Sequence, residues 1–89
     1  MVEIKTSKTA QEKYNEIVNG SKKEIDEFLK KAKEDGINWD EQNKIHKGED
    51  FELYKRKCKN VYVIFSKGKK GEILVFDFLT KSGLLSWMK

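Results

Sequence analysis

The segment from Phe51 to Lys81, FELYKRKCKNVYVIFSKGKKGEILVFDFLTK, most constrains what this chain can fold into. It contains three runs rich in β-branched and aromatic residues, which predict strands. Only CKN-like and KGKKG turns separate the runs, and parallel neighbours would need crossovers of about a dozen residues. The pattern therefore predicts an antiparallel meander with strands at Phe51–Lys57, Val61–Ser66 and Glu72–Leu79.

The first half of the chain predicts one more strand and two helices. Val2–Thr6 alternates apolar and polar side chains, as a short strand does. Capping-box spacing at two positions predicts one helix from about Thr9 to Gly20 and a second from Ser21 to Gly36. Each has an apolar stripe at helical spacing. The stripes are Ala10, Tyr14, Ile17 and Val18 on the first helix, and Ile25, Phe28, Leu29 and Ala32 on the second.

The segment 37–50 has turn residues and few apolar anchors, so we expect a loop with at most a helical turn after Asn38 or Asp40. Trp39 and Ile45 should tuck under the sheet. The whole chain, residues 1–89, is then a single α+β domain of order β-α-α-β-β-β. Its helix hairpin covers one face of a mainly antiparallel sheet. The last strand is apolar on both faces, so it should be central and pair with the N-terminal strand.

Charge and cysteine content bear on partners and compartment. Residues 51–89 carry nine Lys or Arg against three acids, whereas residues 1–50 carry ten against twelve. A basic sheet beside a near-neutral helical half favours a polyanionic partner such as nucleic acid. The single cysteine fits a reducing compartment, and no signal peptide or membrane span is evident, so we expect a cytoplasmic protein. Zinc-ligand spacing is absent, so no metal site is expected.

One motif points to a family. Leu53-Tyr54-Lys55-Arg56-Lys57, a short turn and then Val63-Ile64-Phe65 resemble the RelE/ParE superfamily of small toxins from type II toxin–antitoxin modules. The order of predicted elements agrees with that family over nearly the whole chain. The resemblance implies an antitoxin protein as partner and no cofactor. One branch of the family cleaves mRNA on the ribosome, and the ParE branch inhibits DNA gyrase.

The resemblance also suggests roles for individual residues. Lys55 and Lys57 match paired basic residues that act catalytically in the ribonucleases of the family. Lys81 falls near a second arginine position, and Trp87 falls near a C-terminal tyrosine that stacks on a base. Tyr62 stands where these enzymes commonly have an arginine that holds the scissile phosphate. This departure concerns the cleavage chemistry and not the fold.

Cleavage of RNA by its own 2′-hydroxyl needs a base, an acid and cations, but no metal. We expect Lys55, Lys57 and Lys59 to cluster on one strand face, where their mutual repulsion favours loss of one proton, which would supply the base. Arg56 or Lys81 would stabilise the phosphate oxygens. The alternative is a solvated edge strand whose lysines discourage aggregation.

Strand alternation places Lys55 and Lys57 on the face opposite to Tyr54, Arg56 and Cys58. Neither face is wholly apolar. We expect the two lysines on the open face of the sheet, because Tyr54 and Cys58 are suited to packing under the helices. Arg56 must then leave the core at the sheet margin, or a bulge must switch the register.

Three further features have both a functional and an ordinary reading. His46 is the only histidine, and is either an acid–base residue or incidental in its loop. Lys67, Lys69 and Lys70 contact rRNA phosphates at a hairpin tip, or are simply solvated there. Trp87 stacks on a base, or is buried against the sheet.

The leading hypothesis is a RelE-like, metal-independent mRNA endoribonuclease whose partners are the ribosome, mRNA and an antitoxin. The second is a ParE-like gyrase inhibitor, a binding protein and not an enzyme, which the tyrosine at position 62 favours. The third is a non-catalytic basic module that binds RNA or protein on the same scaffold.

Overall fold

A computed structural model describes residues 2–17, 19–39, 42–47 and 52–87. Five strands form one sheet of order β1-β5-β4-β3-β2, and three helices accompany it. The fold class is α+β, as predicted. In chain order the elements are β1 (Ile4–Thr6), α1 (Lys8–Glu16), α2 (Asn19–Asp35), β2 (Asn43–Lys47), β3 (Glu52–Cys58), β4 (Val61–Lys67), β5 (Ile73–Leu79) and α3 (Lys81–Trp87).

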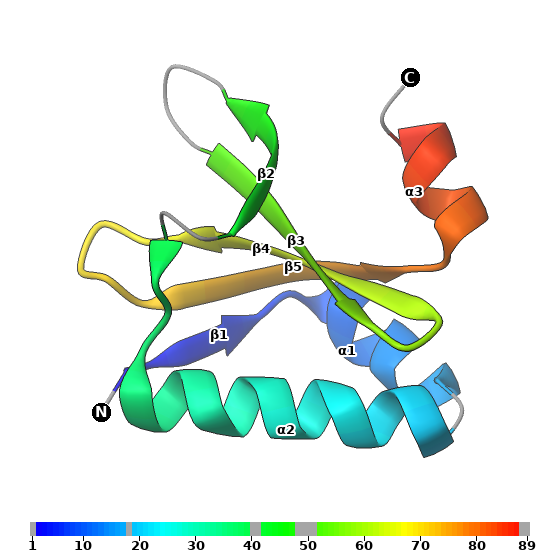
Figure 1. Ribbon diagram of the computed structural model, residues 1–89, viewed down its shortest axis with the longest axis horizontal. Helices are drawn as coiled ribbons and strands as arrows, with labels where there is room; N and C mark the ends of the chain where they lie inside the picture. The colour runs from blue at the N-terminus through cyan, green and yellow to red at the C-terminus, as the bar shows by residue number, and fades with distance from the viewer. Residues whose placement is uncertain (1, 18, 40–41, 48–51, 88–89) are drawn as a thin grey trace.

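The sheet is antiparallel except at one edge. β2, β3, β4 and β5 pair antiparallel in chain order, which confirms the meander. β1 pairs parallel with β5, and Ile4 lies opposite Ile73. β5 is therefore an interior strand with the N-terminal strand on its other edge, as predicted. In Figure 1 the helices α1 and α2 lie below the sheet and α3 lies above it.

α1 begins, and α2 ends, at an identifiable capping residue. The Ser7 hydroxyl accepts a hydrogen bond from the Ala10 amide at 3.1 Å and donates to the Phe76 carbonyl at 2.7 Å. The first helix thus begins at a cap two residues before Thr9, because Ser7 is also held by the sheet. Gly36, at φ 78°, ends α2 as expected, and its amide donates to the Ala32 carbonyl.

Gly20 does not end the first helix. α1 ends at Glu16, Ile17 is extended, and Gly20 lies in the first turn of α2. Its lack of a side chain leaves room for a neighbour. The Lys59 ammonium lies 2.8 Å from the place that a Cβ on Gly20 would occupy, so a side chain there would displace Lys59.

The larger core fills the space between the sheet and the helices α1 and α2. Trp39 packs on it as predicted, with its ring 5.0 Å from Tyr54 and 5.7 Å from Phe65. Tyr14 in α1 donates a hydrogen bond to Asp26 in α2, which ties the two helices together. The buried members are Ala10, Ile25, Ala32, Tyr54, Cys58, Val61, Val63, Phe65, Ile73, Val75 and Phe78.

A smaller core lies on the other face of the sheet, which we call the open face. Leu84 of α3 packs there on Leu53, Ile64 and Leu79, with Ile45 partly buried at its edge. Thr80 caps the start of α3, because its hydroxyl accepts a hydrogen bond from the Gly83 amide at 3.2 Å. This helix anchors the C-terminal end of the chain over the open face.

Two elements were not predicted. β2 occupies part of the segment expected to be a loop, and α3 follows the last predicted strand. Ile45, expected under the sheet beside Trp39, belongs instead to the open-face cluster, because β2 pairs with β3 and a register shift occurs at this residue. Val18, predicted in the apolar stripe of the first helix, and Phe51, predicted to start a strand, lie outside the described residues.

Candidate nucleic-acid interface

β3 presents different chemistry on its two faces, as alternation predicts. Tyr54 and Cys58 are buried in the larger core beneath α1 and α2. Leu53 belongs to the smaller core, so Lys55 and Lys57, at even spacing from it, lie on the open face. The β3–β4 ladder runs without a shift from Tyr54 to Cys58. No bulge is therefore needed to place the lysines on this face.

Lys55 and Tyr62 form the centre of the basic open face. The Lys55 ammonium lies 5.5 Å from the centroid of the Tyr62 ring, within cation–π range. Both side chains are half-buried, while Lys57 is exposed and lies opposite Tyr62 in the ladder. Lys57 also borders a cavity of about 310 Å³ beside α2. The pairing of β2 with β3 starts at Asn43, opposite Lys55, and does not reach Lys57. The result is two cations beside one aromatic ring.

α3 brings a third lysine toward this face. Leu79 pairs with Tyr62, and Lys81 follows two residues later as the first residue of α3. Lys81 is exposed, while Leu84 one turn on is buried in the smaller core. The open face thus has an apolar floor with lysines from β3 and from the start of α3. We call Lys55, Lys57, Tyr62 and Lys81 the cationic face.

Arg56 is not part of the cationic face. Its guanidinium lies 5.3 Å from the Phe28 ring of α2, on the helix-covered side of the sheet. This agrees with the expectation that Arg56 leaves the core at the sheet margin. Arg56 lines the cavity beside α2 together with Lys57, and Lys55 is not part of that lining. The structure therefore does not bring Arg56 to a phosphate held beside Lys55.

Lys59 does not share a strand face with Lys55 and Lys57, so that prediction is wrong. β3 ends at Cys58, and Lys59 occupies the following turn with a left-handed φ of 59°. Such a conformation turns the chain away from strand alternation. The ammonium lies beside Gly20 at the start of α2 instead.

The second basic cluster lies at the other end of the sheet. The Lys67 ammonium lies 6.0 Å from the Trp39 ring, on the helix-covered side, and Lys69 and Lys70 are exposed in the β4–β5 turn. Lys67 is five residues beyond Tyr62 on β4, or about 16 Å at the usual rise of a strand. This cluster is thus separate from the cationic face.

Two candidates are placed by backbone alone. His46 lies in β2 and pairs with Leu53, and Trp87 is the last residue of α3. Both side chains lie outside the described part of the structure. Their predicted roles therefore stay predictions.

The described side chains suit anion binding by cations and an aromatic ring. Among the described residues, no group of three or more His, Cys, Asp or Glu side chains is placed to hold a metal ion. Burial raises the pKa of the Cys58 thiol to about 11, so it is a neutral core group near neutral pH. No helix in the described ranges is long and apolar enough to cross a membrane.

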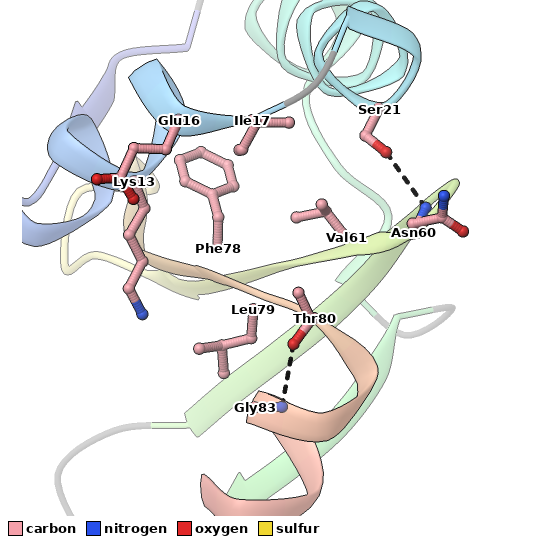
Figure 2. Close-up of a pocket in the computed structure, with 10 residues that line it drawn as sticks. All are labelled: Lys13, Glu16, Ile17, Ser21, Asn60, Val61, Phe78, Leu79, Thr80 and Gly83. Atoms are coloured by element: carbon pink, nitrogen blue, oxygen red, sulfur yellow. Dashed lines mark hydrogen bonds between the residues drawn. The ribbon is translucent and has the colours of Figure 1, made fainter.

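The structure also has an apolar cavity that was not predicted from the sequence. A cavity of about 410 Å³ lies where the end of α1, the start of α2, the β3–β4 turn and the start of α3 meet. Figure 2 shows Ile17, Val61 and Phe78 facing one another across it, with Leu79 and Thr80 on the α3 side. Lys13 at its rim is paired with Asp77 at 2.9 Å. No local sequence pattern predicts this cavity, because its lining comes from four segments that are distant in sequence.

Comparison with known proteins identifies the architecture. No protein-family model matches this chain, and no curated protein matches it significantly in sequence. Among solved structures, a chain of the archaeal RelE–RelB complex from Pyrococcus horikoshii OT3 superposes with a TM-score of 0.70. The match covers 90% of this chain and 94% of that chain at 16% sequence identity. The chain therefore has the fold of the RelE-like toxins.

Proposed function

We propose that this protein is the toxin of a type II toxin–antitoxin module and cleaves mRNA on the ribosome without a metal ion. The observation that carries the proposal is the cationic face, where the Lys55 ammonium lies 5.5 Å from the Tyr62 ring with Lys57 alongside. The similarity to the archaeal RelE–RelB complex supports the toxin class and an antitoxin partner.

The proposed reaction is transesterification within the RNA. The 2′-oxygen attacks the adjacent phosphorus, the bond from phosphorus to the 5′-oxygen breaks, and a 2′,3′-cyclic phosphate and a 5′-hydroxyl result. Lys55 is the proposed base for the 2′-hydroxyl proton. The Tyr62 phenol is the proposed acid for the leaving 5′-oxygen. No other reactant is consumed.

Charge on the pentacoordinate phosphorus must be offset as the reaction proceeds. Lys57 is exposed beside Tyr62, and Lys81 stands at the start of α3 near the same row of the sheet. Both are proposed to stabilise the phosphate oxygens in place of the missing arginine. The apolar residues of the open face form too small a surface to position an RNA strand. In this proposal the ribosome therefore holds the mRNA in place for cleavage.

The test uses neighbouring residues of one strand. Lys55→Ala with Lys57→Ala is expected to lower mRNA cleavage in a purified translation system at least 100-fold. Arg56→Ala is the matched control, because it removes a cation between them that lies on the other face. Mapping of 5′-hydroxyl ends reports the reaction. Cleavage that survives the double substitution, or is lost equally with Arg56→Ala, would contradict the assignment.

One observation favours a second candidate. Tyr62 replaces the arginine that the resemblance leads us to expect, and its ring is covered on one side by Lys55. A ParE-like gyrase inhibitor needs no such arginine. In that case expression would inhibit DNA supercoiling by gyrase while transcripts stay intact, and the same two assays separate the candidates.

A further inference from the structure

The cavity at the C-terminal end of β5 is an apolar pocket that adjoins the cationic face at Lys81 and has none of Lys55, Lys57 and Tyr62 in its lining. Its walls include Ile17 from the end of α1, Val61 from β4, and Phe78 and Leu79 from β5 (Figure 2). Gly83 of α3 closes one side without a side chain. The atoms nearest to a Cβ at Gly83 would be those of Thr80 at 3.4 Å and Leu79 at 3.6 Å, at ordinary van der Waals distance. The volume of about 410 Å³ lies in the usual range for ligand pockets.

Charges around the pocket are unequal. At the rim, Lys13 is neutralised by Asp77 at 2.9 Å, which leaves Glu16 as the rim acid. Beyond the rim, the Lys59 ammonium lies beside Gly20, next to the lining residues Ser21 and Asn60. Lys81 stands between the lining residues Thr80 and Gly83 and is exposed. Two lysines therefore lie near the apolar pocket, Lys59 beside the start of α2 and Lys81 at the start of α3.

We propose that this pocket docks an acidic protein segment that inserts one or two large apolar side chains, and that the segment belongs to the antitoxin. The apolar walls accept the side chains, and Lys59 and Lys81 attract the acidic residues around them. The antitoxin part of this inference rests on the proposed function. According to this inference, the apolar side chains of the partner insert at the end of β5 and not at the centre of the cationic face.

The pocket suits a protein better than RNA. A base needs an accessible ring or guanidinium face to stack on, and the aromatic lining residue, Phe78, is 5% exposed with its ring packed on Tyr14 at 6.0 Å. An aliphatic side chain needs neither a ring face nor a phosphate site.

The test measures binding of the protein encoded by the gene beside this one. Gly83→Leu fills the pocket, and Ser82→Leu adds the same side chain at the neighbouring exposed position as the control. By calorimetry, Gly83→Leu is expected to weaken binding at least tenfold and Ser82→Leu less than twofold. Lys59→Glu should weaken binding several-fold and flatten its salt dependence. If Gly83→Leu melts well below the wild type, its loss of binding could come from unfolding, and the Lys59→Glu result then decides.

The outcomes are distinct. Undiminished binding by Gly83→Leu and Lys59→Glu overturns the inference and leaves the proposed function standing. Pocket-dependent binding without any mRNA cleavage overturns the ribonuclease and leaves the inference standing. If the neighbouring protein does not bind, the inference is overturned. It is also overturned if Gly83→Leu abolishes binding of a 12-nucleotide single-stranded RNA or self-association, which would assign the pocket to RNA or to a second copy.

Discussion

The two faces of the sheet differ in what they contribute. On the helix-covered face, aromatic and aliphatic side chains from β3, β4 and β5 are buried in one large core with α1 and α2. On the open face, four buried residues form a core within the described ranges, and Lys55 and Lys57 lie on the same face of β3 as its member Leu53. The contrast is clearest on β3, where Cys58 is buried and its neighbour Lys57 is exposed.

This difference suggests a division of labour. Burial of apolar area is the main source of stability, so the helix-covered face should determine whether the chain folds. A rigid strand fixes the spacing of the lysines that project from it, so the open face should determine what the fold does. Substitutions on the two faces should therefore separate stability from activity.

The largest effect is expected from Phe65→Ala on the helix-covered face. Phe65 is fully buried, and its ring lies 5.6 Å from Phe28 and 5.8 Å from Tyr54. Its loss should lower the free energy of unfolding by about 3–5 kcal/mol. Urea denaturation measures this. Ile64→Ala, the adjacent residue in the open-face core, should cost about 2 kcal/mol. Equal losses would remove the distinction between the faces.

Tyr62→Phe should affect activity and spare stability. The substitution keeps the ring beneath Lys55 and removes only the phenol, the proposed acid. mRNA cleavage should fall about 100-fold, while the urea midpoint stays near that of the wild type. A cleavage rate within twofold of wild type would show that Tyr62 is not the acid. A loss of stability as large as the loss of activity would place Tyr62 among the core residues.

Leu84→Ala tests whether the open-face core holds α3. Leu84 is 4% exposed, whereas its neighbour Leu85 is 56% exposed. Leu84→Ala should cost about 2 kcal/mol and lower the melting temperature by roughly 10 °C. Leu85→Ala should change it by less than the equivalent of about 0.5 kcal/mol. Indistinguishable melting curves for the two variants would mean that α3 contributes little to the fold.

The strongly patterned elements were predictable from sequence, and the weakly patterned ones were not. The β3–β5 meander and the stripes of α1 and α2 carry enough apolar residues to specify their own faces. β2 has the sequence NKIHK, which lacks a strand-like run and forms a strand only because β3 offers an edge. α3 is seven residues long with an internal glycine, and it depends on Leu84 meeting the sheet.

The site was predictable as far as strand alternation reaches. Alternation placed Lys55 and Lys57 on the open face and Cys58 under the helices. It failed at Lys59, because the turn residue has a positive φ that composition does not reveal. It also gave no sign that Arg56 would lie over Phe28, since that contact needs α2 beside β3. Strand alternation does not predict contacts between segments that are distant in sequence.

The smallest effect is expected from ionisation on the helix-covered face. Burial raises the pKa of Cys58 from 9.0 to about 11, with Arg56 opposing the shift and Glu24 adding to it. Below pH 9 the thiol is neutral in both states, and its contribution to stability is complete. Between pH 9 and 11 the unfolded chain ionises first, so stability falls as pH rises. We expect a loss of about 1 kcal/mol, less than the full shift because the nearby charges are solvated.

Cys58→Ala isolates this contribution. Lysine deprotonation in the same pH range affects both proteins alike, so only the difference between their stabilities should change. Urea denaturation at pH 8, 9, 10 and 11 should show the wild type losing its advantage over Cys58→Ala as pH increases. Parallel curves would mean that the thiol ionises as easily in the fold as in the unfolded chain. The helix-covered face would then admit water at Cys58, and the contrast between the two faces of β3 would be weaker than its burial indicates.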